Sequence, residues 1–347
     1  MSSVQLKTYA KINLSLDVTG VREDGYHEVS MVMQAVDLCD ELSVTVYPAP
    51  SDRVLIQTDN PEVPTDEKNT AYRAAHEMLE LYASLKEGSQ VGEEALKKNM
   101  DKPDAEKGPQ LKEQEGAAEL MQSSGAQAGY EVCIEIRKNI PVAAGLAGGS
   151  SNAAGVILAL NKILKMNLNM DRLCAVGRKV GADVPFCIMS AAASQQQLLG
   201  VKGGAACVLA EGIGEIMTPL RSVAFWVVLA KPPVSVSTAE VYKTLDKITV
   251  PKHPETTRLI EGIETGNMQK IKASMGNVLE NVTFSMCPMS GQLKERMNGK
   301  GSIAAMMSGS GPTVFSLFSG KHRAMAMASS LKDMEEDGCA VFLTKTL

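Results

Sequence analysis

One glycine-rich segment constrains the fold of this chain more than any other feature. Residues 140–160 read IPVAAGLAGGSSNAAGVILAL, with four glycines in eleven residues followed by an apolar stretch of helical character. Just upstream, residues 130–136 alternate apolar and polar side chains with the period of a strand. We therefore predict a strand, a glycine-rich loop and a helix, in that order.

This loop is a candidate phosphate-binding site. The first turn of a helix offers unpaired N–H groups and a partial positive charge, and glycines let a phosphate approach the backbone closely. The segment is not a Walker A loop, because no Gly-Lys-Ser/Thr follows the glycines, and it contains no G-x-G-x-x-G. On glycine content alone, a flexible turn before a helix capped by Ser150, Ser151 or Asn152 explains the pattern equally well.

The bulk properties exclude several classes of protein. A length of 347 residues exceeds one ordinary core, so two domains are expected. The net charge of −5 argues against a nucleic-acid partner. No apolar run reaches the roughly 18 residues of a membrane span, and no signal-peptide core is visible, so we expect a cytoplasmic protein without a membrane partner. The seven cysteines form no C-x-x-C pair, which disfavours a zinc site.

The first predicted strand carries two unusual polar residues. Residues 4–18 are largely apolar, yet Lys11 and Asn13 occupy the face opposite Ile12 and Leu14. Either this face is a solvent-exposed edge, or the pair points into a functional site. After the turn at residues 20–27, which contains Tyr26 and His27, alternation resumes at residues 29–33 and 42–46.

Further elements follow from periodicity. Strands are predicted at residues 53–58, 303–307, 314–318 and 340–343, with a strand and turn at 207–215 and a buried strand at 225–233 that ends in a double proline. Helices are predicted at 69–85, 170–180, 258–266, 268–275, 292–297 and 322–334. Asn69 or Thr70 is the expected N-cap of the first helix, Asp171 can cap the second, and Pro185 is expected to stop a helix. Residues 86–128 have few large apolar side chains, which predicts a disordered or loosely helical insertion. Residues 191–206 look like a second, local insertion.

Together these features indicate phosphoryl transfer. Two glycine-rich loops (the second is SGSGPT, residues 308–313), a lysine within a strand and Asp183 in GADVP form the pattern. Catalysis of this kind relies on positioning and charge neutralisation, with an acid that accepts the hydroxyl proton. A nearby lysine would keep that acid ionised.

On these residues the chain resembles the GHMP kinase superfamily. The resemblance rests on AKINLSLDVTGVREDGYHEV, PVAAGLAGGSSNAA, GADVPF, LAEGIGE and MMSGSGPTVFSLF, and it spans the chain except for the two insertions. The AKINL and GYHE segments resemble the branch that phosphorylates a cytidine-diphosphate alcohol. The resemblance implies an α+β fold with an S5-like N-terminal domain, residues 1–222, and a ferredoxin-like C-terminal domain, residues 223–347. The active site would lie in the cleft between them.

The resemblance also implies a role for each matching residue. Asp183 matches the general base and Lys11 the lysine beside it. Asn13, Tyr26, His27, Thr238 and Tyr242 match substrate-binding residues, with Tyr26 stacking on the cytosine, His27 reading it by hydrogen bonds and Tyr242 completing the sandwich. Gly309, Ser310 and Gly311 match a loop that supports the nucleotide. The predicted ATP-binding residues are Asn69, Lys138, Pro141, Val142, Ala143, Ala144, Gly145, Leu146, Ala147, Gly148, Gly149, Ser150 and Ser151.

The reaction class also predicts cofactors and partners. ATP is the expected cofactor and Mg²⁺ is expected with it, but no metal ligands are identified. Ala147 stands where the family often has glycine, which matters only if its φ is positive. The expected partners are ATP and a small molecule, with the chain a monomer or weak homodimer. Alternatives are another GHMP kinase of mevalonate or homoserine type, or a non-catalytic sensor on the same fold; an RNA-binding protein is disfavoured by charge.

Overall fold

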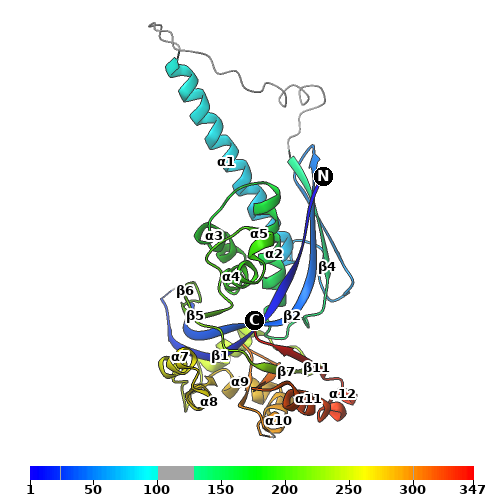
Figure 1. The fold of residues 1–347 in the computed structure, drawn as a ribbon, viewed down its shortest axis with the longest axis vertical. Helices are drawn as coiled ribbons and strands as arrows, with labels where there is room; N and C mark the ends of the chain where they lie inside the picture. The colour runs from blue at the N-terminus through cyan, green and yellow to red at the C-terminus, as the bar shows by residue number, and fades with distance from the viewer. Residues whose placement is uncertain (24, 101–128, 300) are drawn as a thin grey trace.

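Two β-sheets with helices packed on them make up the described part of the protein (Figure 1). The computed structural model describes residues 1–23, 25–100, 129–299 and 301–347. The larger sheet has the order β3-β4-β2-β1-β8, and β5 pairs with both β2 and β6. Its strands are β1 (Ser2–Val21), β2 (His27–Ala49), β3 (Arg53–Thr58), β4 (Gly129–Arg137), β5 (Cys207–Gly212), β6 (Ile216–Pro219) and β8 (Gly276–Asn277).

Strands β1 and β2 form a long antiparallel hairpin from which the site is built. Ser2 pairs with Val46 at one end and Val21 with His27 at the other. The sequence predicted two separate runs where β2 is in fact continuous, because bulges along the hairpin interrupt the alternation of side chains. One of these irregularities falls between Asn13 and Ser15, next to the unusual polar pair.

Helices pack on one face of the larger sheet (Figure 1), and the first core, which lies between them and the sheet, continues into the smaller sheet through Val228 and Val314. These helices are α1 (Thr70–Met100), α2 (Gly148–Ile163), α3 (Met170–Val180), α4 (Val184–Ser194) and α5 (Gln196–Leu199). α2 is central: its residues from Ser151 to Asn161 are buried. A helix buried on all sides is expected to be apolar throughout, as residues 153–160 are.

The smaller sheet has the order β11-β7-β10-β9. Its antiparallel strands are β7 (Trp226–Lys231), β9 (Ala304–Met307), β10 (Val314–Phe318) and β11 (Ala340–Lys345). The other described helices are α6 (Thr238–Leu245), α7 (Thr256–Thr265), α8 (Met268–Ser274), α9 (Glu280–Met286), α10 (Pro288–Met297), α11 (Lys321–Ser329) and α12 (Lys332–Glu336). The α+β prediction is confirmed.

The two sheets share a second apolar core. Ile12 and Leu14 of β1 pack there with Val227 and Leu229 of β7 and Phe315 of β10. Strand β8, which follows α8 in the chain, returns to pair with β1 in parallel. A domain boundary near residue 222 would fall between β6 and β7, and it remains a prediction.

Several local predictions were wrong. Pro185 does not stop a helix but stands in the first turn of α4, where its missing N–H costs nothing. The N-cap of α2 is Ala147, without a side-chain cap, and α3 is capped by Asn169 rather than Asp171. The helix predicted at 322–334 is divided between α11 and α12.

The two predicted insertions have different outcomes. We predicted that the helix ends at residue 85, where the first insertion begins, but α1 continues to Met100. The rest of this insertion, residues 101–128, lies outside the described part of the chain. Residues 191–206 pack against the first core through Leu199 and Val201. The Gln195 side chain accepts from the backbone N–H of Lys7 and donates to its C=O, which ties this segment to β1. Among the described residues, no helix is both long and apolar enough to cross a bilayer.

Gly155 allows α2 to lie close against the β1–β2 hairpin. A Cβ at this position would lie 2.5 Å from Thr8 Cγ2 and 2.6 Å from Leu42 Cδ2, both on buried side chains. Overpacking a core costs about 1–3 kcal/mol, whereas alanine favours a helix by about 1 kcal/mol. We therefore expect Gly155→Ala to lower the midpoint of thermal unfolding, followed by far-UV circular dichroism.

The matched control is Gly291→Ala in α10. A Cβ there would contact Phe284 at 3.7 Å, an ordinary van der Waals distance, so only the helix preference changes. Gly291→Ala should raise the unfolding midpoint. A rise with Gly155→Ala as well would show that α2 is not held tightly against the hairpin.

Candidate active site

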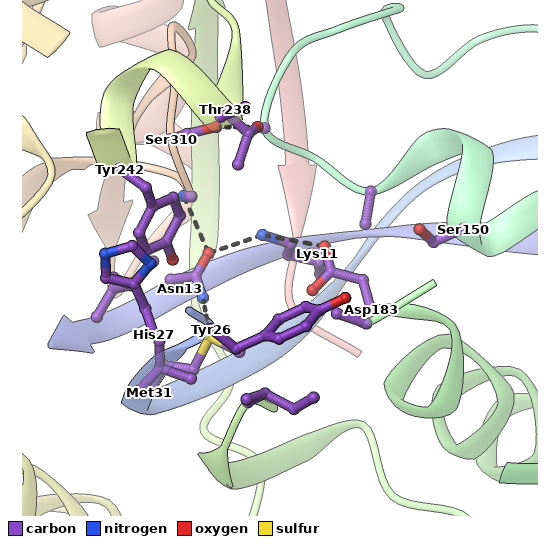
Figure 2. A pocket seen from close by; sticks show the side chains of 18 of the residues that line it. Lys11, Asn13, Tyr26, His27, Met31, Ser150, Asp183, Thr238, Tyr242 and Ser310 are labelled. Atoms are coloured by element: carbon purple, nitrogen blue, oxygen red, sulfur yellow. Dashed lines mark hydrogen bonds and ion pairs between the residues drawn. The ribbon is translucent and has the colours of Figure 1, made fainter. Parts of the chain in front are cut away.

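A cleft of about 910 Å³ opens where the two sheets meet. Side chains reach it from β1, from the turn before β2, from the glycine-rich loop, from the start of α4, from α6 and from the loop after β9 (Figure 2). The predicted site residues that line this cleft are Lys11, Asn13, Tyr26, His27, Gly145, Ala147, Ser150, Asp183, Thr238, Tyr242, Gly309 and Ser310.

Lys11 and Asn13 point from β1 into this cleft and not to solvent. Both residues are buried, with exposed fractions of 4% and 0%. Lys11 Nζ donates to Asn13 Oδ1 at 2.8 Å, and the backbone N–H of Gly309 donates to the same oxygen at 2.9 Å. Asn13 Nδ2 faces the sulfur of Met31 at 3.4 Å. The amide therefore fixes the lysine and joins β1 to the loop after β9.

Asp183 faces Lys11 from the start of α4. Its Oδ2 lies 3.9 Å from Lys11 Nζ, and the aspartate side chain is 31% exposed. Although Asp183 is the N-cap residue of α4, its carboxylate makes no capping hydrogen bond. The carboxylate is thus directed into the cleft beside a buried ammonium group (Figure 2). A partly accessible carboxylate beside a cation can accept a proton from a hydroxyl group placed between them.

The two glycine-rich loops contact each other through their backbones. Gly145 has φ +73°, and a Cβ there would lie 2.3 Å from the carbonyl oxygen of Ser308. A Cβ on Gly309, with φ +58°, would lie 3.2 Å from both Gly145 O and Lys11 Nζ. Ser308 Oγ donates to Gly145 O at 3.0 Å. Only glycine permits this approach, so the second loop supports the first.

The glycine-rich loop ends at the exposed N-terminus of α2. The first helical hydrogen bond runs from Ser151 N to Ala147 O, so the N–H groups of residues 148–150 have no partner within the helix. Ala147 has φ +57°, the left-handed conformation in which a Cβ is costly. Ser151 is buried and its hydroxyl donates to Tyr9 O, whereas Ser150 lines the cleft.

A second pocket of about 320 Å³ lies on the other side of the loop. Gly145, Ala147 and Ser150 line both pockets, so the loop separates them. The predicted ATP-binding residues that line this pocket are Asn69, Lys138, residues 141–145 and residues 147–150. Asn69 Oδ1 accepts from Ala71 N, which confirms its predicted capping role. Leu146, Ser151 and Gly311 line neither pocket.

Lys138 is held in a buried ion pair below the loop. Its Nζ lies 2.6 Å from Asp40 Oδ2 and donates to Ile140 O at 2.7 Å. Burial lowers the pKa of Lys138, and the attraction of Asp40 acts in the opposite direction. Asp40, which is fully buried, also accepts from the backbone N–H of Asn139 and Ile140 and from Asn152 Nδ2. One carboxylate thus ties the start of the loop to α2.

An aromatic group closes the end of the cleft beside α6. The His27 and Tyr242 rings lie 4.7 Å apart between centroids and are inclined at 45°. Burial, assisted by the negative charge of Asp183, raises the pKa of Tyr242 to about 12, so its phenol is neutral at physiological pH. Tyr26 is 61% exposed on the turn before β2. Thr238 Oγ1 lies 2.7 Å from Ser310 Oγ and links α6 to the loop after β9.

Sequence reasoning missed three residues that matter here. Lys243 and Asp246 line the cleft from α6 and its end, and Asp40 anchors the loop. Asp40 lies in β2 between Asp37 and Glu41, an acidic stretch that is typical of an exposed strand, so the signal that identified Lys11, a charge within an apolar strand, was absent for it. Nothing in the local sequence marks Lys243 or Asp246, because only the packing of α6 brings them to the cleft.

Comparisons with known proteins show which proteins this chain is similar to. The chain matches the family models "GHMP kinases N terminal domain" over residues 113–191 and "GHMP kinases C terminal" over residues 259–337. It is 40% identical to the 4-diphosphocytidyl-2-C-methyl-D-erythritol kinase of Alkaliphilus metalliredigens (strain QYMF), over 95% of this chain and 93% of that protein. It is 38% identical to the enzyme of that name from Clostridium botulinum (strain Alaska E43 / Type E3), over 99% and 100%.

Solved structures extend the comparison. A crystal structure of 4-(cytidine 5'-diphospho)-2C-methyl-D-erythritol kinase is similar with a TM-score of 0.65 and 27% identity, covering 99% of both chains. Mevalonate kinase from L. major, in complex with R-mevalonate, has a TM-score of 0.61 and 13% identity, covering 99% of this chain and 96% of that one. The second likeness shows a shared fold and nothing more.

The Asp40 ion pair generates a prediction about stability. In Asp40→Asn an amide NH₂ would face the donors Lys138 Nζ and Asn152 Nδ2. Removing one partner of a buried ion pair lowers the free energy of unfolding by about 3–5 kcal/mol. We expect a loss of that size in the free energy of unfolding, and we expect Lys138→Met combined with Asp40→Asn to lose less than the sum of the two single changes. The measurement is a double-mutant cycle from urea unfolding.

The control is the surface pair of Glu77 and Lys179, whose charged atoms lie 3.0 Å apart. Glu77→Gln should leave the urea midpoint nearly unchanged, because water screens exposed pairs. Equal effects of Glu77→Gln and Asp40→Asn would contradict the anchoring role given to Asp40.

Proposed function

We propose a reaction for this chain on the premise that it belongs to the GHMP kinases and, within them, to the 4-diphosphocytidyl-2-C-methyl-D-erythritol kinases. The chain is an ATP-dependent kinase that phosphorylates the 2-hydroxyl of 4-diphosphocytidyl-2-C-methyl-D-erythritol. The products are the 2-phosphate and ADP, in the non-mevalonate route to isoprenoid precursors. The observation that carries the proposal is the pairing of Lys11 and Asp183 in a cleft that also holds Tyr26, His27 and Tyr242.

ATP would bind with its phosphates at the N-terminus of α2. The N–H groups of residues 148–150, which have no partner within the helix, and the positive end of the helix dipole favour anionic oxygens there. The nucleoside would then lie in the pocket bordered by Asn69 and residues 141–145. Lys138 lines this pocket, but its ammonium group is committed to Asp40. We therefore assign Lys138 the task of holding the loop in place beneath the nucleotide.

Asp183 would act as the general base. It accepts the proton of the 2-hydroxyl while the alcohol oxygen forms a bond to the γ-phosphorus and the bond from that phosphorus to the β,γ-bridging oxygen breaks. Lys11, 3.9 Å away, would stabilise the negative charge that develops on the transferred group. Asn13 keeps the lysine oriented through its 2.8 Å hydrogen bond.

Mg²⁺ is expected to accompany ATP, since it neutralises the β and γ phosphates when bound. Among the described residues, no cluster of three or more His, Cys, Asp or Glu side chains could hold a metal ion. A site with few protein ligands suits Mg²⁺, because this ion keeps several waters and binds largely through phosphate oxygens. Ser150, which lines both the cleft and the pocket on the other side of the loop, is the protein oxygen we assign beside the phosphates.

The cytosine would bind at the aromatic end of the cleft. Tyr26 offers an exposed ring, and the neutral phenol of Tyr242 offers a second one that packs against His27. Mevalonate and homoserine carry no base, so a kinase for either would have no use for these rings. The two rings therefore favour the cytidine compound over the other GHMP substrates.

A substrate panel with ATP tests the proposal. We expect rapid ADP release with 4-diphosphocytidyl-2-C-methyl-D-erythritol and turnover at least about 100-fold slower with mevalonate or homoserine, since a site built to bind a base loses that binding energy with them. Phosphorus NMR of the product should show a new phosphate monoester. Turnover of mevalonate or homoserine at the same rate would refute the substrate assignment, and no turnover of any compound would favour a sensor.

The role of Asp183 can be tested by Asp183→Asn. The change keeps the shape but removes the base, so kcat should fall by about 100-fold or more while ATP still binds. Lys11→Ala should also lower kcat, and the double variant should lose less than the product of the two factors, because the residues act together. Steady-state kinetics and ATP titration by calorimetry provide the measurements.

Asp337→Asn supplies the control, because it makes the same chemical change at an exposed residue that ends α12. It should leave kcat and KM unchanged. Near-normal turnover of Asp183→Asn would rule out this residue as the base.

A further inference from the structure

A carboxylate that no motif marked stands at the base-binding end of the cleft. Asp246 is the C-cap residue of α6, and its Oδ1 lies 2.7 Å from His27 Nε2. The His27 side chain is 15% exposed and that of Asp246 is 45% exposed. Both residues line the cleft together with Tyr26 and Tyr242.

Helix stability does not explain an acid at this position. The C-terminal end of a helix carries a partial negative charge, which disfavours a carboxylate there. A half-exposed pair with histidine contributes little to folding. The capping contact of Asp246 is made by its backbone N–H, which bonds to Thr244 O and Tyr242 O and would be the same for any residue. The carboxylate of Asp246 is therefore not needed for the helix cap and can bind a ligand in the cleft.

The chemistry of a carboxylate fixes what this pair can recognise. An ionised carboxylate only accepts hydrogen bonds, so the short contact places a proton on His27 Nε2. Among the described residues, Asp246 Oδ2 has no partner. The cleft thus presents an acceptor oxygen beside the two rings that would hold a planar base.

We propose that Asp246 is a specificity-determining residue that selects cytosine over uracil. The inference rests on the proposed function, which places a cytidine moiety at this end of the cleft. Cytosine carries an exocyclic amine, a donor, where uracil carries a carbonyl oxygen, an acceptor. A carboxylate accepts from the cytosine amine and repels the uracil oxygen. Asp246 Oδ1 accepts the hydrogen bond from His27 Nε2 and so fixes the imidazole ring. Asp246 Oδ2 accepts a hydrogen bond from the exocyclic amine of cytosine.

The variant Asp246→Asn separates recognition from positioning. An asparagine keeps the size of the side chain and an oxygen that accepts from His27 Nε2, but it replaces the second oxygen with an NH₂ donor. That donor repels the cytosine amine and pairs with the uracil carbonyl. We expect the ratio of kcat/KM for the cytidine substrate to kcat/KM for its uridine analogue to fall by roughly 5- to 150-fold. The KM for ATP should not move.

Two further variants complete the design. Glu240→Gln removes a negative charge from the exposed face of the same helix and should leave the ratio unchanged. Asp246→Ala removes both carboxylate oxygens and should lower the efficiency with cytidine more than with uridine. Circular dichroism and ATP binding establish that each variant is folded.

The outcomes distinguish this inference from the proposed function. A wild-type ratio well above one that drops in Asp246→Asn supports the proposal. A ratio that stays within about twofold in both Asp246 variants overturns it, as does a uniform loss of efficiency with both substrates, which would mean that Asp246 only positions His27. If the wild-type enzyme phosphorylates neither nucleotide compound, the proposed function itself fails.

Discussion

The buried amide of Asn13 joins the two halves of the site. Its Oδ1 accepts one hydrogen bond from the ammonium group of Lys11, on the same strand, and another from the backbone N–H of Gly309, in the loop after β9. Both bonds lie out of contact with water, where an unpaired polar group is costly. The position of Lys11 relative to Asp183 therefore depends on how the second sheet docks against the first. The geometry of the Lys11–Asp183 pair and the packing of the two sheets therefore depend on the same contact.

A second buried polar group fixes the other side of the cleft. Asp40 binds the start of the glycine-rich loop and Asn152 of α2 at once, so the loop and the helix behind it keep one relative position. Between these two anchors, Gly145 and Gly309 bring the loops within backbone contact. The loop that separates the two pockets is held from both sides, which suits catalysis that depends on placing two substrates accurately.

Much of this arrangement could be predicted from residue patterns, and the failures have physical causes. The strand–loop–helix unit and the special status of Lys11, Asn13 and Asp183 followed from polar residues in apolar or glycine-rich surroundings. The predicted cap of α2 was wrong because Ala147 begins this helix in a left-handed conformation that its side chain disfavours. Asp246 was missed because its neighbourhood in sequence is ordinary and only the packing of α6 against the β1–β2 hairpin brings it to His27.

The central claim is that one cleft aligns a hydroxyl beside Asp183 with a phosphate on α2. A crystal structure with 4-diphosphocytidyl-2-C-methyl-D-erythritol and a non-hydrolysable ATP analogue tests it most directly. The account predicts the 2-hydroxyl within hydrogen-bond distance of Asp183, the terminal phosphate between Lys11 and residues 148–150, and the cytosine between Tyr26 and Tyr242. A cytosine bound beside Asn69, or a 2-hydroxyl far from Asp183, would contradict the account.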